Sequence, residues 1–257
     1  MPLREARGQR PTVLVEACVD SVQSAIAAET GGAQRLELCA SLNDGGTTPS
    51  AGTIAAIKAH VAIPVFVIVR PRGGDFFYDA HELDVTRRDI AVALDLGADG
   101  LVIGALGPDA RIDHQVVRSL LRDVGAVPIT FHRAFDVAAD LDDALDALVS
   151  LGIRRVLTSG GAMTALEGVH RLASLVTRAA GRIEVMAGGG IRAEHVETIV
   201  RQSGVREIHV RGTRVRPAHM PTAHARVRFR KPFPDDEGAW EETDAEAIRR
   251  IVAAAAR

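Results

Sequence analysis

The sequence predicts a (β/α)8 barrel, the α/β fold also known as a TIM barrel, folded as one domain over residues 1–257. Eight short apolar runs recur along the chain, and each is followed by a segment with the periodicity of an amphipathic helix. The length of 257 residues is close to the roughly 250 residues typical of this fold, and no Pro- or Ser-rich linker divides the chain. An open doubly wound sheet is less favoured, because it often has fewer strands and a glycine fingerprint after the first one, where this chain has Val19-Asp20-Ser21.

The predicted strands are short apolar runs bounded by turn-forming residues. They cover residues 13–18, 35–39, 64–70, 100–104, 128–132, 155–159, 183–187 and 207–211. The helix after the first strand is expected to have Asp20 as its N-cap and to end at Gly31 or Gly32. Broad apolar stripes predict the fourth helix over 116–124, the fifth over 141–148 with Gly152 as its stop, and the eighth over 247–255.

One irregular segment, residues 212–244, precedes the last helix. It contains a basic run over residues 226–231 and four prolines, Pro217, Pro221, Pro232 and Pro234. A connection this long without periodicity is uncommon in a compact domain. We therefore expect this segment to form a cap or a contact between the subunits of a homo-oligomer.

Charge and hydropathy argue against several classes of partner. The net charge is −2, from 31 basic and 33 acidic residues, which does not favour a nucleic acid or an anionic membrane. No apolar run approaches the roughly 18 residues needed to span a bilayer, and residues 1–12 lack the apolar core of a secretory signal. The two cysteines are too few for a disulfide framework and fit a reducing compartment. The expected location is the cytoplasm.

The first two predicted strands contain the same Glu-x-Cys pattern, at Glu16 and Cys18 and again at Glu37 and Cys39. Because side chains alternate between the two faces of a strand, each Glu shares a face with its Cys. The intervening residues are apolar and suit the face covered by helices. The Glu and Cys side chains are therefore expected to point into the barrel, with the cysteines nearer the C-terminal mouth, where the sites of this fold lie.

Carboxylates inside a barrel are costly unless they are paired. The same alternation places His132 and His209 inward, and Arg70 and Arg72 lie at the end of the third strand. The alternative to a functional site is a network of buried ion pairs that only fills the interior of the barrel. Two carboxylates, two histidines and two arginines at C-terminal strand ends favour a functional pocket, because titratable groups cluster at such sites.

Cys18 and Cys39 end adjacent strands on the same face, so their sulfur atoms are expected to lie close together. Two thiolates suit a soft ion such as Cu(I), whereas a zinc site would need four close ligands. A reversible disulfide is also compatible with neighbouring strand ends. Each cysteine alone is more often a small buried hydrophobic residue.

Glycine-rich turns form a second candidate site. Ser159 begins the turn after the sixth strand, and Gly188, Gly189 and Gly190 follow the seventh, with Arg192 leading into a helix. Loops after strands seven and eight of such barrels often bind phosphate through backbone N–H groups and a helix N-terminus. The turn therefore predicts a site for an anion, although glycine also serves simply to permit tight turns.

Residues 70–78 form the most unusual string in the chain. Arg70 and Arg72 flank a proline and predict a rigid cationic arm at the mouth. Phe76, Phe77 and Tyr78 then bring together three of the nine aromatic residues. We expect them to serve as a hydrophobic lid or as a dimer contact.

Six strings from strands two to seven resemble the CutC family of copper homeostasis proteins. They are RLELC at 35–39, GGTTPS at 45–50, RPRGGDF at 70–76, TFHRAFD at 130–136, VLTSG at 156–160 and MAGGGIR at 186–192. The resemblance implies a cytosolic (β/α)8 barrel that self-associates, with a proposed Cu(I) site at two cysteines that correspond to Cys18 and Cys39. The chain departs from the family at residues 211–213, where Arg-Gly-Thr replaces a turn that is often rich in serine.

Two functions are therefore carried forward, with no organic cofactor expected. The first is a copper homeostasis protein that binds Cu(I) at Cys18 and Cys39. The second is an enzyme acting on a small anionic or phosphorylated substrate, with His132 or Glu37 as general base and Arg70 as the clamp on the anion. Its acid–base and binding groups are Glu16, Glu37, Arg70, His132, Asp136 and His209, with Arg72, Ser159, Gly188, Gly189, Gly190 and Arg192 at the anion site. An oligomeric scaffold with a vestigial polar mouth is a third, less specific reading.

Overall fold

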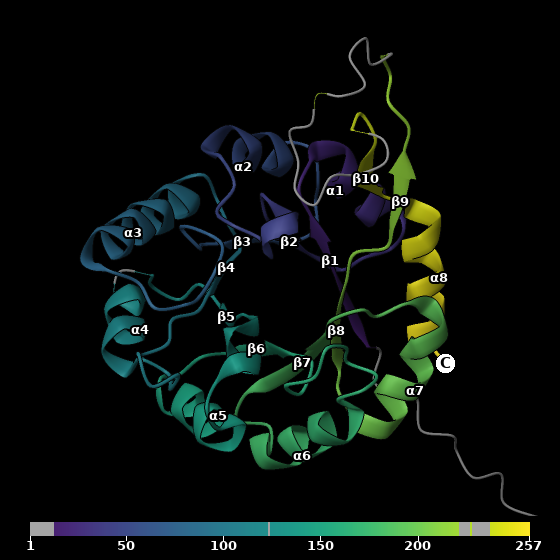
Figure 1. The fold of residues 1–257 in the computed structure, drawn as a ribbon. Helices are drawn as coiled ribbons and strands as arrows, with labels where there is room; N and C mark the ends of the chain where they lie inside the picture. The colour runs from purple at the N-terminus through teal and green to yellow at the C-terminus, as the bar shows by residue number, and fades with distance from the viewer. Residues whose placement is uncertain (1–12, 123, 221–226, 228–236) are drawn as a thin grey trace, which may run out of the picture.

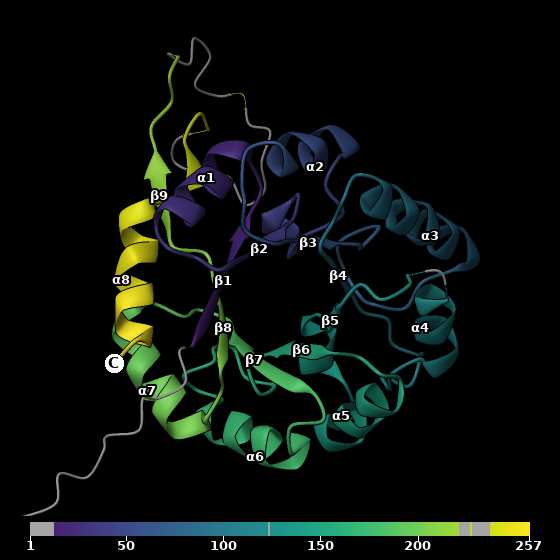
Figure 2. The same cartoon turned by 180° about the vertical axis from the view of Figure 1, so that it is seen from behind.

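The computed structural model describes residues 13–122, 124–220, 227 and 237–257. Eight parallel strands close into a barrel in the order β1 to β8, and the helices surround it (Figure 1). The view from behind shows the same ring of helices outside the strands (Figure 2). The predicted (β/α)8 fold class is confirmed.

Each strand lies within two residues of the predicted bounds, because strands covered on both faces are recognisable as continuous apolar runs. The barrel strands are β1 Leu14–Val19, β2 Arg35–Leu38, β3 Val65–Ile68, β4 Gly100–Ile103, β5 Ile129–Phe131, β6 Arg155–Thr158, β7 Glu184–Gly188 and β8 Glu207–Val210.

The helices follow the strands in the expected alternation. They are α1 Val22–Thr30, α2 Ala51–Lys58, α3 Ala80–Asp95, α4 His114–Leu121, α5 Leu141–Ser150, α6 Val169–Ala179, α7 Ala193–Ser203 and α8 Ala245–Ala255, with short 3-10 helices η1 Leu42–Asp44 and η2 Arg133–Val137.

Some predicted helix boundaries were wrong. α4 ends at Leu121 and does not extend to residue 124. The N-cap of α1 is Ser21 and not Asp20, because the helix begins one residue later than expected. The Ser21 backbone is extended, and its hydroxyl oxygen accepts a hydrogen bond from the backbone N–H of Ser24 at 3.1 Å. This geometry satisfies a backbone donor that the first turn of a helix leaves open.

The strand register brings the polar side chains of the inner face together. Glu16 of β1 lies opposite Arg35 of β2 and opposite His209 of β8, and Cys18 lies opposite Glu37. Val15 and Ala17, which alternate with them, belong to the large apolar core between the strands and the helices. The predicted inward face of the first two strands is thus the observed one.

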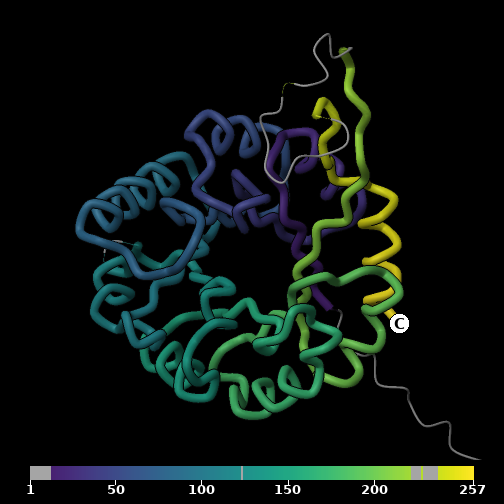
Figure 3. The backbone as a smooth tube through the Cα atoms, viewed as in Figure 1, coloured from purple at the N-terminus to yellow at the C-terminus, as the bar shows by residue number. Residues whose placement is uncertain are grey.

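Residues 212–244 are only partly irregular. β9 Thr213–Arg216 pairs in antiparallel fashion with β10 Trp240–Thr243, and the chain passes from β8 through this pair to α8 (Figure 3). Within this segment the side chains of Val215 and Met220 are largely exposed. Pro221, Pro232, Pro234 and most of the basic run lie outside the described residues, and the expected role as a cap or a subunit contact stays a prediction. Among the described helices, none is long and apolar enough to cross a membrane.

Candidate functional site

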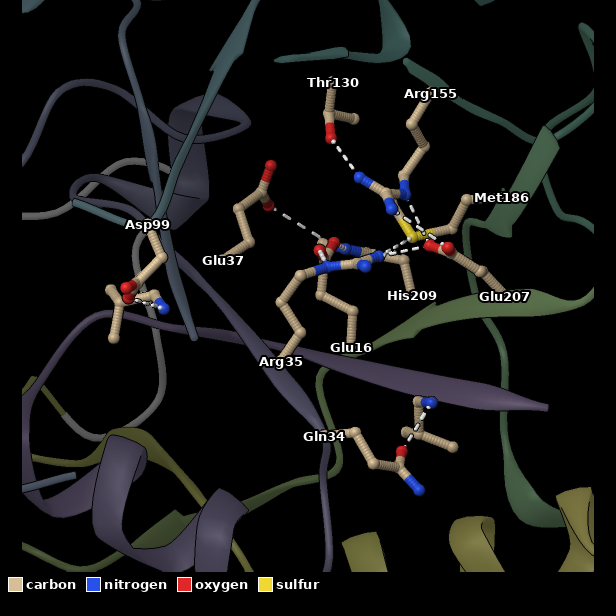
Figure 4. Close-up of polar contacts among 12 residues, drawn as sticks. Glu16, Gln34, Arg35, Glu37, Asp99, Thr130, Arg155, Met186, Glu207 and His209 are labelled. Carbon is tan, nitrogen blue, oxygen red and sulfur yellow. Dashed lines mark hydrogen bonds and ion pairs between the residues drawn. The ribbon is translucent and has the colours of Figure 1, made fainter. Parts of the chain in front are cut away.

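The deepest polar layer of the barrel is a network of ion pairs (Figure 4). Arg35 contacts the carboxylates of both Glu16 and Glu207, and Arg155 also contacts Glu207. Arg155 Nη1 donates to Thr130 Oγ1 at 3.3 Å. Every charge of this layer has an opposite charge beside it, which offsets the cost of burial.

Arg35, Arg155 and Glu207 were not among the residues expected to face inward. A signal for Arg35 and Glu207 exists in the sequence, since Arg35 lies two positions before Glu37 and Glu207 two positions before His209. Their ion pairs take the place that was expected for Arg70 and Arg72. Arg72 instead lies outside the barrel mouth, where it pairs with Glu82 and Asp75.

His209 joins this layer to the one above it. Its Nδ1 lies 2.8 Å from Glu16 Oε1, and its Nε2 lies 3.5 Å from Glu37 Oε2. Burial alone would lower the pKa of His209, but the nearby Glu37, Cys18 and Glu16 raise it well above its usual value. Burial likewise opposes ionisation of Glu16, yet Arg35 and His209 lower the pKa of that carboxyl to about 2. The imidazolium therefore bridges two carboxyl groups.

The two thiols lie directly above this bridge. The Sγ atoms of Cys18 and Cys39 are 3.7 Å apart, and Cys39 Sγ is 3.5 Å from Glu37 Oε2. The hydrogen bond from Cys39 lowers the pKa of Cys18 to about 5, and the same contact with burial raises that of Cys39. Burial, with Cys18 and Glu16 nearby, raises the pKa of Glu37 to about 8. Donor atoms of Cys18, Glu37 and Cys39 all lie within 4.8 Å of one another.

A cavity of about 760 Å³ opens above the thiols at the C-terminal ends of the strands. Its lining includes Cys18, Glu37, Cys39, Arg70, His132, His209, Gly189, Gly190 and Arg192, together with Phe76 and Arg250. The structure thus gathers nine of the predicted site residues around one space. Glu16, Arg72, Asp136, Ser159 and Gly188 are not part of its lining.

Arg70 is buried in the wall of this cavity, with 4% of its surface exposed. Nη1 donates to the carbonyl oxygens of Asp44 and Gly46, and Nη2 donates to that of Gly74, each at 2.8 Å. No described carboxylate lies within ion-pair distance of it. Arg70 therefore fixes the loops after β2 and β3 and keeps an unpaired positive charge.

His132 directly follows β5 and is equally buried. Its Nδ1 accepts a hydrogen bond from the backbone N–H of Ala134 at 3.1 Å, so in the neutral ring the hydrogen is on Nε2. Burial, and then the charge of Arg70, lowers the pKa of His132 to about 3. These features favour a hydrogen-bond donor over the general base considered from the sequence, which leaves Glu37 as the candidate base.

Asp136 and Ser159 organise the loop after β6. The Asp136 carboxylate pairs with Arg133 and accepts hydrogen bonds from the hydroxyl of Thr158, from the backbone and side chain of Ser159, and from Gly161 N. Because its oxygen atoms are already occupied, Asp136 is placed to position this loop.

The glycine turn after β7 borders the cavity. Gly189 and Gly190 have φ angles of +106° and +64°, in the region that favours glycine. A Cβ on Gly188 would lie 2.5 Å from Leu157 Cδ1 and 3.2 Å from His209 Cβ, so a larger residue here would displace the side chain of Leu157. Arg192 precedes α7 without capping it through its side chain. Anion binding at this turn stays a prediction.

The fold and the mouth define a class of protein: a TIM barrel with a buried dithiol–carboxylate cluster at the C-terminal end of its strands. The model of the CutC family matches residues 13–214, and the chain belongs to that family. The human copper homeostasis protein cutC homolog is 45% identical over 242 residues, covering 94% of this chain and 89% of the relative. The family protein CutC of Xanthomonas axonopodis pv. citri (strain 306) is 42% identical over 238 residues, covering 93% and 97%.

Solved structures agree with this assignment. The crystal structure of CutC from Streptococcus agalactiae matches with a TM-score of 0.74 and 36% identity, covering 77% of this chain and 98% of that one. Phosphoribosylanthranilate isomerase from Pyrococcus furiosus matches with a TM-score of 0.54 and 18% identity, covering 95% and 98%. The second likeness shows the TIM-barrel fold alone.

Proposed function

We propose that this protein binds Cu(I) through Cys18 and Cys39 at the mouth of the barrel, in the service of the copper homeostasis for which its relatives are named. The observation that carries the proposal is the distance of 3.7 Å between two buried, free sulfur atoms. They come from adjacent strands, so the barrel itself holds them together.

The donor set fits Cu(I) better than zinc. Soft thiolate ligands select Cu(I), and two of them suffice. A structural zinc site is almost always tetrahedral with four N, S or O ligands. The metal-ligating groups that the structure brings together in the described chain are Cys18, Glu37 and Cys39, and the carboxylate is a hard donor.

Other residues of the mouth have defined supporting roles in this proposal. Glu37 lies beside Cys39 Sγ, and in its ionised form, which is the major form above its pKa of about 8, it can accept the proton that this thiol loses when it becomes a ligand. His209 holds Glu37 and Glu16 in place from below. The apolar side chains of Phe66, Ile68 and Val102 pack against the two thiols.

Anaerobic titration with Cu(I) against a competing chelator tests this site. The double variant Cys18→Ser, Cys39→Ser should weaken Cu(I) binding by more than about 100-fold, because even residues that only support a metal's ligands change affinity by about 10–100-fold. Met163→Leu, which removes an exposed sulfur atom, is the matched control and should bind as the wild type does. Equal affinity of the double variant and the wild type would remove the proposal.

A second candidate function, an enzyme acting on a small anionic substrate, is favoured by the position of Glu37. This carboxyl group lines the same cavity as Arg70 and His132, neither of which a Cu(I) site needs. A cavity of about 760 Å³ falls within the range of roughly 300–1,000 Å³ that small-molecule sites occupy. In this second function the ionised form of Glu37, whose pKa of about 8 lies near the working pH, is the general base, and the cationic wall holds the substrate.

The proposed enzymatic function is tested by the exchange of a carbon-bound hydrogen of the substrate with solvent deuterium. A panel of small carboxylated and phosphorylated carbonyl compounds, incubated with the wild type in D2O, should include one whose carbon-bound hydrogen exchanges with solvent. Glu37→Gln should slow this exchange by about 10²–10⁴-fold, the usual contribution of a general base. Ser174→Ala, on the exposed face of α6, is the control. Absence of exchange and of turnover for every compound with the wild type contradicts this function.

A further inference from the structure

We infer that Arg70 and His132 form a binding site for an anionic oxygen of a small organic ligand, separate from the two thiols. The site deepens the second candidate function, because it names the group by which a substrate is recognised. It concerns binding, and it stands whether or not the ligand is then converted.

The unpaired charge of Arg70 is the first observation. The other two buried arginines of the barrel, Arg35 and Arg155, each contact a carboxylate. Arg70 is as buried as they are, yet its hydrogen-bond acceptors are three carbonyl oxygens. Its Nε has no acceptor within hydrogen-bond distance in the described part of the chain, and the neighbouring hydroxyl of Tyr78 carries no charge. A buried guanidinium without a counter-charge is costly. An anion supplied by a ligand offsets this cost.

The open hydrogen of His132 is the second, independent observation. Nδ1 is occupied by Ala134 N, and Nε2 is buried without a partner among the residues described. Buried N–H groups are rarely left without an acceptor, because an unmet donor costs the full loss of its hydration. Both Nε atoms, one from Arg70 and one from His132, therefore need an acceptor, and both residues line the same cavity.

Phe76 connects the two donors and explains why solvent does not satisfy them. Its ring centre lies 4.9 Å from the guanidinium carbon of Arg70 and 5.0 Å from the ring centre of His132. The ring is half-exposed, lines the cavity and follows the glycine pair that includes Gly74, with φ of +81°. A ligand reaches the two donors when this single ring moves aside. In this proposal Phe76 acts as the lid that was expected from the sequence, and it covers the donors of Arg70 and His132.

The position of the site sets the orientation of the ligand. Its anionic oxygen lies at the wall formed by the ends of β3 and β5, while Glu37, Cys18 and Cys39 line the same cavity from β1 and β2. A carboxylate and a phosphate group share the chemistry that these donors recognise, since both accept charge-assisted hydrogen bonds.

A pair of substitutions at one position isolates the open donor. The side-chain oxygen of Asn in His132→Asn reproduces Nδ1, so the bond to Ala134 N is kept and the donor at Nε2 is deleted. The amide of Gln in His132→Gln extends to the place of Nε2 and restores a donor. Calorimetric titration with sodium acetate and with inorganic phosphate then measures the site, with sodium chloride as the control for ionic strength.

We expect at least one of the two anions to bind the wild type, and His132→Asn to weaken it by about tenfold or more, as loss of a charge-assisted hydrogen bond does. His132→Gln should recover part of that affinity, and Cys18→Ser, Cys39→Ser should leave it unchanged. Binding of acetate alone identifies a carboxylate as the natural group, and binding of phosphate alone identifies a phosphate. NMR spectra of the wild type labelled with ¹⁵N-histidine should show the Nε2 resonance of His132 shifting as the anion is added. This measurement does not depend on the folding of any variant.

Three results overturn the inference: neither anion binds the wild type, His132→Asn binds as tightly as the wild type, or the double cysteine variant loses the anion. The Cu(I) titration gives a separate answer, because His132→Asn leaves both thiols intact. A protein that binds the anion without Cu(I), or Cu(I) without the anion, shows which of the two sites has failed.

Discussion

Replacing Arg35 with methionine is expected to lower the free energy of unfolding by about 3–5 kcal/mol, the cost of breaking a buried ion pair from one side. Arg35 contacts both Glu16, which is fully buried, and Glu207. Its removal leaves the two carboxylates with only His209 and Arg155 as cations. Since domains are stable by about 5–15 kcal/mol, this is a large part of the total. Guanidinium denaturation followed by circular dichroism measures it.

Two further variants show whether the loss comes from the charge. Adding Glu16→Gln to Arg35→Met should restore part of the stability, because it removes one of the uncompensated charges. Arg88→Met, which breaks an exposed pair with Asp84, should change stability by less than about 0.5 kcal/mol. If Arg35→Met and Arg88→Met had equal effects, the buried network would not stabilise the barrel.

The second large effect is a loss of stability in acid that depends on His132. The pKa of His132 in the folded protein is about 3, below the ordinary value of 6.5. Between these values the unfolded chain binds a proton that the folded protein does not. The stability is therefore fully present above pH 6.5 and falls as the pH drops toward 3, by about 1.4 kcal/mol for each pH unit in the middle of that range.

His132→Asn should flatten this dependence. Between pH 6 and pH 4 the free energy of unfolding of the wild type should fall by about 2 kcal/mol more than that of the variant. Glu16, whose pKa is lowered to about 2, adds a loss at lower pH that both proteins share. His170→Asn, at an exposed position of α6, controls for removing a histidine. Parallel curves for the wild type and His132→Asn would show that the neutral ring is not what makes the fold sensitive to acid.

The strands could be predicted because their signal is local. A parallel strand covered on both faces is a short apolar run, and each such run in this chain became a strand of the barrel. The cap of α1 was misplaced by one residue, since Asp20 and Ser21 are both good N-caps. The local sequence does not show which of the two is the N-cap. In the structure the helix begins at Val22, and this makes Ser21 the N-cap.

The inner face could be predicted in part. Alternation along the strands correctly placed Glu16, Cys18 and Glu37 on one side. It could not choose their partners, because alternation gives the face of a side chain but neither its height in the barrel nor its neighbours around it. Arg70 was expected to pair with these carboxylates, and Arg35 does so instead.

The sequence by itself determined the (β/α)8 fold, the inward face of the first strands and the closeness of Cys18 and Cys39. Only the tertiary structure decided which charges are satisfied. Closure of β8 against β1 brings His209 to Glu16 across 193 positions of the chain. That contact and the ion pairs of Arg35 engage the carboxylates of Glu16 and Glu207. Arg70 Nε and His132 Nε2 are then left without a hydrogen-bond partner among the described residues. Pairing in a closed barrel depends on the shear and tilt of all its strands, which no local pattern contains.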